Sequence, residues 1–164
     1  MHSDQLVETA PQLIKLARSQ SCFIATAESC TAGRIAASIT EISGSSDVFD
    51  RGFVTYTNQS KSEMLDVPMP LINKLGAVSK EVAISMSEGA LKHSNAQVSV
   101  AVTGIAGPSG GTATKPVGLV HIASAKQNAP TLHHEHHFKG SRHDVRVQTT
   151  QKALELVIKQ LSDS

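Results

Sequence analysis

Aromatic side chains are scarce in this 164-residue sequence: they make up 3% of it, with no Trp and a single Tyr. This scarcity argues against the aromatic platforms on which proteins stack single-stranded nucleic acid. An excess of one charge is missing too, because 15 Lys and Arg are balanced by 14 Asp and Glu, for a formal net charge of +1. A chain without a basic excess has no overall field that would attract a polyanion. We therefore predict no nucleic-acid partner.

Cysteines and long apolar runs are also few. Cys22 and Cys30 are the two cysteines, too few and too close in sequence to suggest a disulfide framework. No apolar run approaches the ~18 residues that a membrane-spanning helix requires. The N-terminal residues Met-His-Ser-Asp lack the pattern of a signal peptide. We expect a cytoplasmic protein without a membrane partner.

The alternation of short apolar runs with amphipathic stretches indicates one α/β domain spanning residues 1–164. The stretches expected as strands are residues 22–26, 51–57, 98–102, 116–124 and 132–138. The stretches expected as helices are residues 4–19, with Pro11 as a kink or a later start, the region from about 34 to Ser43, a short segment after Asn58, a segment capped by Ser79, and residues 142–161. Residues 71–75 are expected to form at most one helical turn. This pattern favours a three-layer sandwich, a mixed β-sheet with helices on both faces, and leaves the strand order open.

Residues 26–33, Thr-Ala-Glu-Ser-Cys-Thr-Ala-Gly, link an apolar strand to an amphipathic helix. A tight turn of this kind presents backbone N–H groups at a helix N-terminus, where they can stabilise negative charge. Ser29 and Thr31 would then be placed for chemistry on an anionic or carbonyl-containing ligand. The structural alternative is that Ser29 or Thr31 is simply the N-cap of the helix.

Lys61 falls in the first turn of the short helix that Asn58 is expected to cap. A Lys at this end of a helix opposes the helix dipole, which disfavours its charged form, as a general base requires. The alternative is a solvated surface Lys, the usual fate of this residue type.

A glycine-rich stretch, Thr103-Gly-Ile-Ala-Gly-Pro-Ser-Gly-Gly-Thr112, follows the apolar strand at 98–102. Such a loop lets backbone amides approach a phosphate closely, although it matches neither the Walker A nor the dinucleotide pattern. A flexible hairpin connection would explain it equally well. Arg142 and Arg146 lie four residues apart at the start of the last helix, where cations are unfavourable unless an anion meets them. A phosphate-bearing partner would satisfy both features.

The segment His133-His134-Glu135-His136-His137 suggests a zinc site at first sight. On a strand, His134 and His136 would point to one face and the other three side chains to the opposite face. Each face could in principle hold a metal, but the sequence indicates no open-site geometry and no second shell. An edge strand protected by polar residues explains the segment without a metal. We predict no metal and no cofactor.

Four stretches together resemble the CinA C-terminal domain family, the nicotinamide-nucleotide amidohydrolases also called PncC. They are Glu28–Gly33, Val54–Lys61, Gly76–Ser79, and Thr103–Pro108 with the following Gly110-Gly111-Thr112 and Lys115–Gly118. The resemblance runs from about residue 5 to residue 160, in the family's order. It implies hydrolysis of the carboxamide of nicotinamide mononucleotide to nicotinate mononucleotide and ammonia, in pyridine nucleotide recycling, by a homodimer.

By motif match, Ser29 resembles the family's nucleophile and Lys61 its base, with Tyr56 and Thr103 assisting. The substrate-binding residues that the resemblance and the motifs suggest are Cys30, Thr31, Gly33, Gly104, Gly107, Gly110, Gly111, Arg142 and Arg146. A Ser–Lys pair is chemically reasonable, because amide hydrolysis needs an activated hydroxyl and a base. Ala32 departs from the family pattern, which usually has glycine there. The alternative to an enzyme is a non-catalytic nucleotide-binding or interaction module of the same fold.

Overall fold

The computed structural model describes residues 2–163, and side chains from residue 8 onward. Leu6 and Val7, two apolar residues at helical spacing in the helix predicted over 4–19, therefore lie outside the described side chains. In chain order the elements are α1 (His2–Ser19), β1 (Ile24–Glu28), α2 (Arg34–Thr40), the 3-10 turn η1 (Ser45–Asp47), β2 (Phe49–Val54), α3 (Asn58–Leu65), α4 (Met69–Leu75), α5 (Lys80–Lys92), β3 (Val98–Gly104), β4 (Leu119–Lys126), β5 (Leu132–His137) and α6 (Arg142–Ser162).

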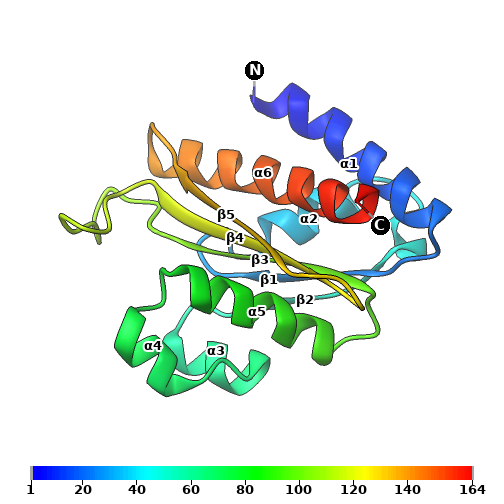
Figure 1. The fold of residues 1–164 in the computed structure, drawn as a ribbon. Helices are drawn as coiled ribbons and strands as arrows, with labels where there is room; N and C mark the ends of the chain where they lie inside the picture. The colour runs from blue at the N-terminus through cyan, green and yellow to red at the C-terminus, as the bar shows by residue number, and fades with distance from the viewer. Residues whose placement is uncertain (1, 164) are drawn as a thin grey trace.

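The strands form one five-stranded sheet in the order β2-β1-β3-β4-β5. Strand β1 pairs in parallel with β2 and with β3, whereas β3, β4 and β5 pair antiparallel. Helices α1, α2 and α6 cover one face of the sheet, and α3, α4 and α5 lie on the other (Figure 1). The predicted α/β sandwich with a mixed sheet is confirmed.

Each face of the sheet carries its own apolar core. Val100, Ile122 and Leu154 belong to the core under α1, α2 and α6, whereas Val82 and Met86 belong to the one under α5. All five are fully buried, and truncating a buried Leu, Ile or Met of this kind to Ala typically costs about 2–5 kcal/mol. Within residues 2–163, no helix has an apolar stretch that could cross a bilayer.

Two strand ends differ from the sequence prediction in ways that shape the site. Strand β1 continues to Glu28 instead of ending at 26, so Ser29 follows the strand directly. Strand β2 ends at Val54 instead of 57, because the carbonyls of Thr55 and Tyr56 turn toward the Lys61 amine. As a result, the ends of the parallel neighbours β1 and β2 both lie beside the amine of Lys61.

The other strand limits shift by a few residues. Strand β4 begins at 119 instead of 116, because Pro116 lacks an N–H and its carbonyl accepts from the Leu119 amide in a turn. Strand β3 extends to Gly104, two residues beyond the predicted end.

Several helix predictions need correction. Thr57, not Asn58, caps α3, since its hydroxyl accepts from the Ser60 amide at 3.1 Å. Residues 69–75 form a true helix, because Pro70 lies in its first turn, where no intrahelical N–H bond is lost. Helix α2 ends at Thr40, three residues earlier than expected. Pro11 lies inside α1, and Ser79 caps α5 as predicted.

Candidate active site

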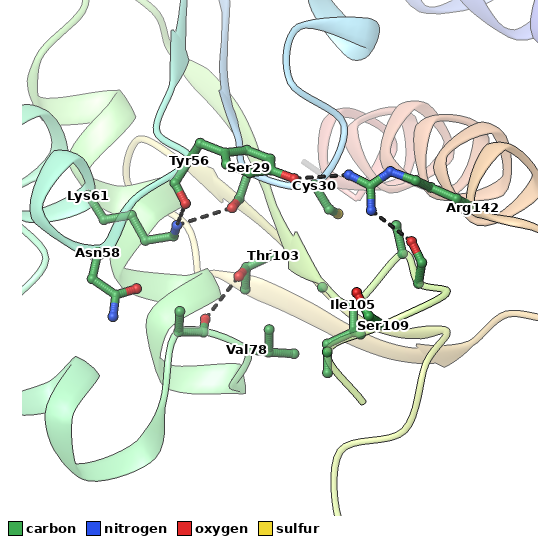
Figure 2. A pocket seen from close by; sticks show the side chains of 15 residues that line it. Ser29, Cys30, Tyr56, Asn58, Lys61, Val78, Thr103, Ile105, Ser109 and Arg142 are labelled. Atoms are coloured by element: carbon green, nitrogen blue, oxygen red, sulfur yellow. Dashed lines mark hydrogen bonds between the residues drawn. The ribbon is translucent and has the colours of Figure 1, made fainter. Parts of the chain in front are cut away.

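A cavity of about 280 Å³ opens at the carboxyl ends of β1 and β3. The chain leaves β1 for β2 on one side and reaches β3 on the other, so the cavity lies where the strand order reverses. Open α/β sheets bind ligands at such switch points, in the crevice beyond the strand ends. The residues that line the cavity come from the turn after β1, the segment that runs from β2 into α3, the residues before α5, the end of β3 with its following loop, and the first residue of α6 (Figure 2).

Glu28 organises the turn that carries Ser29. Its buried carboxylate accepts hydrogen bonds from the Thr31 hydroxyl at 2.6 Å and from the Ile35 amide at 2.8 Å. It also accepts from the Ala36 amide at 3.1 Å, so it satisfies two N–H groups in the first turn of α2 that have no partner within the helix. The structural alternative, in which Ser29 or Thr31 caps this helix, is therefore wrong.

The hydroxyl of Ser29 faces the amine of Lys61. Oγ of Ser29 and Nζ of Lys61 are 3.1 Å apart, and the Lys61 side chain is only 1% exposed. The same Nζ donates to the carbonyls of Thr55 at 2.8 Å and Tyr56 at 3.3 Å. A surface role for Lys61 is therefore excluded, and Figure 2 shows the amine directed at Ser29.

Burial lowers the pKa of Lys61 from 10.5 to about 8, because the protein interior disfavours the charged amine. A thiolate at Cys30 would oppose this shift. Burial also raises the pKa of Cys30 to about 12, however, so this thiol is neutral near pH 7. A neutral, buried thiol is a poor nucleophile, which leaves Ser29 as the activated group of the turn.

Arg142 joins two walls of the cavity. Its guanidinium donates to the hydroxyl oxygen of Tyr56 at 2.9 Å and to the carbonyl of Gly107 at 2.8 Å. Arg142 is the first residue of α6. Figure 2 shows its guanidinium across the cavity from the Lys61 amine. Both bonds leave further guanidinium N–H groups for an anion.

Thr103 lies at the floor of the cavity, buried at the end of β3. Its hydroxyl donates to the carbonyl of Ala77 at 2.9 Å, which ties the strand to the segment before α5. The oxygen can then only accept further hydrogen bonds. Gly104, Gly107 and Gly110 of the following loop line the same cavity.

Four of the residues predicted to bind substrate do not line this cavity. They are Thr31, Gly33, Gly111 and Arg146. Arg146 donates to the carbonyls of Cys30 at 3.0 Å and Thr31 at 3.1 Å, so it holds the backbone of the turn. Gly33 has a φ of 101°, a left-handed conformation that favours glycine. These two residues shape the turn after Ser29.

Other cavity residues were not among the predicted site residues. They are Asn58, Ala77, Val78, Ile105, Ala106 and Ser109. The sequence held a signal for Asn58, because it precedes Lys61 by three residues, a spacing that puts two side chains on one helix face. The apolar residues give no such signal, since only the tertiary fold turns them into walls.

The histidine-rich strand β5 is an edge strand outside this cavity. His134 and His136 line a hollow with Lys152 and Glu155 of α6, whereas His133 stacks on His121 of β4. Among the described residues, no three His, Cys, Asp or Glu side chains converge as metal ligands would.

The comparisons with known proteins agree with one another. The sequence model of the CinA C-terminal domain matches residues 7–161. The nicotinamide-nucleotide amidohydrolase PncC of Escherichia coli K12 is 40% identical, over 98% of this chain and 97% of that protein. A CinA-like protein of Geotalea uraniireducens is 46% identical over 89% of this chain, which spans only 34% of that longer relative.

Solved structures show the same likeness. A crystal structure of the competence/damage inducible protein CihA from Agrobacterium tumefaciens superposes with a TM-score of 0.94 at 48% identity, covering 96% of each chain. An Escherichia coli protein of the CinA superfamily superposes with a TM-score of 0.91 at 30% identity, covering 96% of this chain and 91% of that one.

Proposed function

The chain belongs to the CinA C-terminal domain family, and from this we propose that it hydrolyses the carboxamide of nicotinamide mononucleotide to nicotinate mononucleotide and ammonia. The observation that carries the proposal is the buried Ser29–Lys61 pair, 3.1 Å apart, in a cavity with Arg142 on its far side. A relative that matches along nearly its whole length, the Escherichia coli PncC, bears the name of this activity.

The surroundings of Lys61 suit a general base. The carbonyls of Thr55 and Tyr56 can only accept hydrogen bonds, so a neutral amine directs its two N–H groups at them. Its lone pair is then left for the third neighbour, the hydroxyl of Ser29. Two backbone carbonyls thus orient the amine as a base, as the third member of a catalytic triad orients its histidine.

The proposed reaction proceeds through an acyl-enzyme. Ser29 Oγ attacks the carboxamide carbon while its proton passes to Lys61, and the charged amine then gives that proton to the leaving nitrogen. The C–N bond breaks, ammonia leaves, and the acyl group remains on Ser29. Water then attacks the ester with its proton passing to Lys61, which returns it to the Ser29 oxygen as the carboxylate is released.

We assign the phosphate of the substrate to the opposite end of the cavity. Arg142 offers free guanidinium N–H groups there, and the loop from Gly104 to Gly110 brings its backbone close to the same space. Arg142, and not Arg146, is the cation that we place against the substrate, because Arg146 is committed to backbone carbonyls. Binding energy from the phosphate would position the carboxamide at Ser29.

We further propose that the protein acts as a cytoplasmic homodimer in pyridine nucleotide recycling, without a cofactor, a metal or a nucleic-acid or membrane partner. The balanced charge of +1 supports the absence of a nucleic-acid partner, and the two free, buried cysteines suit a reducing compartment.

Release of ammonia from nicotinamide mononucleotide by the purified chain tests the proposal. We expect turnover, and we expect Ser29→Ala to lower it by at least about a thousandfold while binding of the mononucleotide persists. Ser38→Ala is the matched control, since the Ser38 hydroxyl bonds to the Arg34 carbonyl within α2, away from the cavity. Binding without ammonia release by the unmodified chain would favour the non-catalytic nucleotide-binding module instead.

A further inference from the structure

Asn58 lines the catalytic cavity without any role in the mechanism above. It is the first residue of α3, and its side chain is exposed to the cavity. Its carboxamide has no hydrogen-bond partner among the described residues, whereas the neighbouring Gln59 donates to Glu63 at 2.6 Å. A side-chain amide that is both unpaired and next to the reacting groups is available to a ligand.

The position of Asn58 relative to Lys61 decides which part of a ligand it meets. The two residues are three apart on α3, and Figure 2 shows them side by side on one wall of the cavity. Two of the polar neighbours of the Lys61 amine are backbone carbonyls, and the third is Ser29. A cavity ligand therefore meets this amine on the side of Ser29, at the wall that also carries Asn58 (Figure 2).

The leaving nitrogen of an amide must occupy this same space. Lys61 can protonate that nitrogen only at hydrogen-bond distance, while the carboxamide carbon is bonded to Ser29 Oγ. The nitrogen carries two hydrogens, and hydrogen-bond acceptors in the cavity can hold it in a fixed orientation. Thr103 can supply one acceptor because its own proton is given to Ala77, and Asn58 can supply the other.

We propose that the Asn58 Oδ1 atom accepts a hydrogen bond from the substrate's carboxamide NH2 and so selects amides and aims the leaving nitrogen at Lys61. This inference rests on the proposed deamidase function and deepens it. Asn58 is a specificity-determining residue at the leaving-group side of the cavity, opposite the Arg142 end that we assign to the phosphate.

A pair of substrates separates this role from a structural one. Nicotinamide mononucleotide has a leaving nitrogen with two hydrogens, whereas the methyl ester of nicotinate mononucleotide has a leaving oxygen with none. Ser29 and Lys61 act on both, with methanol instead of ammonia released from the ester. A contact made through the amide hydrogens can therefore affect only the first substrate.

We expect Asn58→Ala and Asn58→Leu to lower kcat/KM for the mononucleotide by about tenfold to a hundredfold. For the methyl ester, kcat/KM should stay within about threefold, and the pH profile should be unchanged for both substrates because Lys61 is intact. Gln59→Ala is the matched control, an exposed neighbour on the same helix turn that does not line the cavity.

Each result of this experiment has a defined meaning. Equal losses on amide and ester would make Asn58 a structural residue, and no loss on either would show that it does not meet the leaving group; both overturn the proposal. With either of these two results, turnover of the mononucleotide by the unmodified chain would still support the proposed function, and only the role of Asn58 would be wrong. If the unmodified chain hydrolyses neither substrate, both proposals fall together.

Discussion

The pH dependence of activity follows from the environment of Lys61. Only the neutral amine can take the proton of Ser29, and burial lowers the pKa of Lys61 to about 8. At pH 7, about one Lys61 in ten is then neutral, against roughly one in three thousand for an amine titrating near 10.5. The buried position thus raises the active fraction about three-hundredfold at neutral pH.

We expect kcat/KM for nicotinamide mononucleotide to rise about tenfold per pH unit below about pH 8 and to level off above it. Lys61→Arg should be as inactive as Lys61→Met, because a guanidinium remains charged and cannot accept the proton. The assay is initial-rate ammonia release from pH 5.5 to 10, with folding of each variant checked by circular dichroism. An apparent pKa above 10, or most of the activity retained in Lys61→Arg, would refute the general-base assignment.

The same pKa shift predicts a change in stability. The pKa of Lys61 is lower in the folded chain, so between about pH 8 and 10.5 the unfolded chain binds more protons and stability rises with pH. Relative to Lys61→Met, the wild-type chain should gain about 3 kcal/mol of unfolding free energy across this window. Denaturant titrations at both ends of the window measure it, and a constant difference between the two proteins would contradict the buried, shifted amine.

Two further predictions concern the phosphate end of the cavity and the turn after Ser29. We expect kcat/KM for nicotinamide riboside to be about a hundredfold lower than for the mononucleotide, because the riboside lacks the phosphate. Arg142→Ala should remove most of this difference. If the variant still prefers the mononucleotide to the riboside to the same extent, Arg142 is excluded as the phosphate ligand. Ala32 has a φ of 47°, in the left-handed region, so Ala32→Gly should raise the free energy of unfolding by up to about 1 kcal/mol. Gly33→Ala, at a φ of 101°, should lower the free energy of unfolding by at least about 1 kcal/mol. Denaturant unfolding that finds Ala32→Gly less stable, or Gly33→Ala more stable, than the unmodified chain would contradict the backbone strain inferred at these two positions.

The sequence by itself determined the α/β class, because strand and helix periods alternate along the chain and short polar turns separate them. It also singled out the turn at Ser29 and the glycine-rich loop, since small polar and glycine residues directly after apolar strands are unusual enough to notice. Lys61 stood out because a lysine in the first turn of a helix opposes the helix dipole. It did not determine the strand ends, because a strand stops where its carbonyls find other donors. For β2 that donor is the amine of Lys61.

Only the tertiary structure decided what these residues do together. Ser29 and Lys61 are 32 positions apart, and their 3.1 Å contact exists because β1 and β2 pair in parallel and end side by side. The burial that lowers the Lys61 pKa comes from the packing around α3, which no local pattern encodes. Arg142 and Arg146 look alike in sequence, yet one faces the cavity and the other holds the turn, because residues four apart on a helix share a face but reach different neighbours along it.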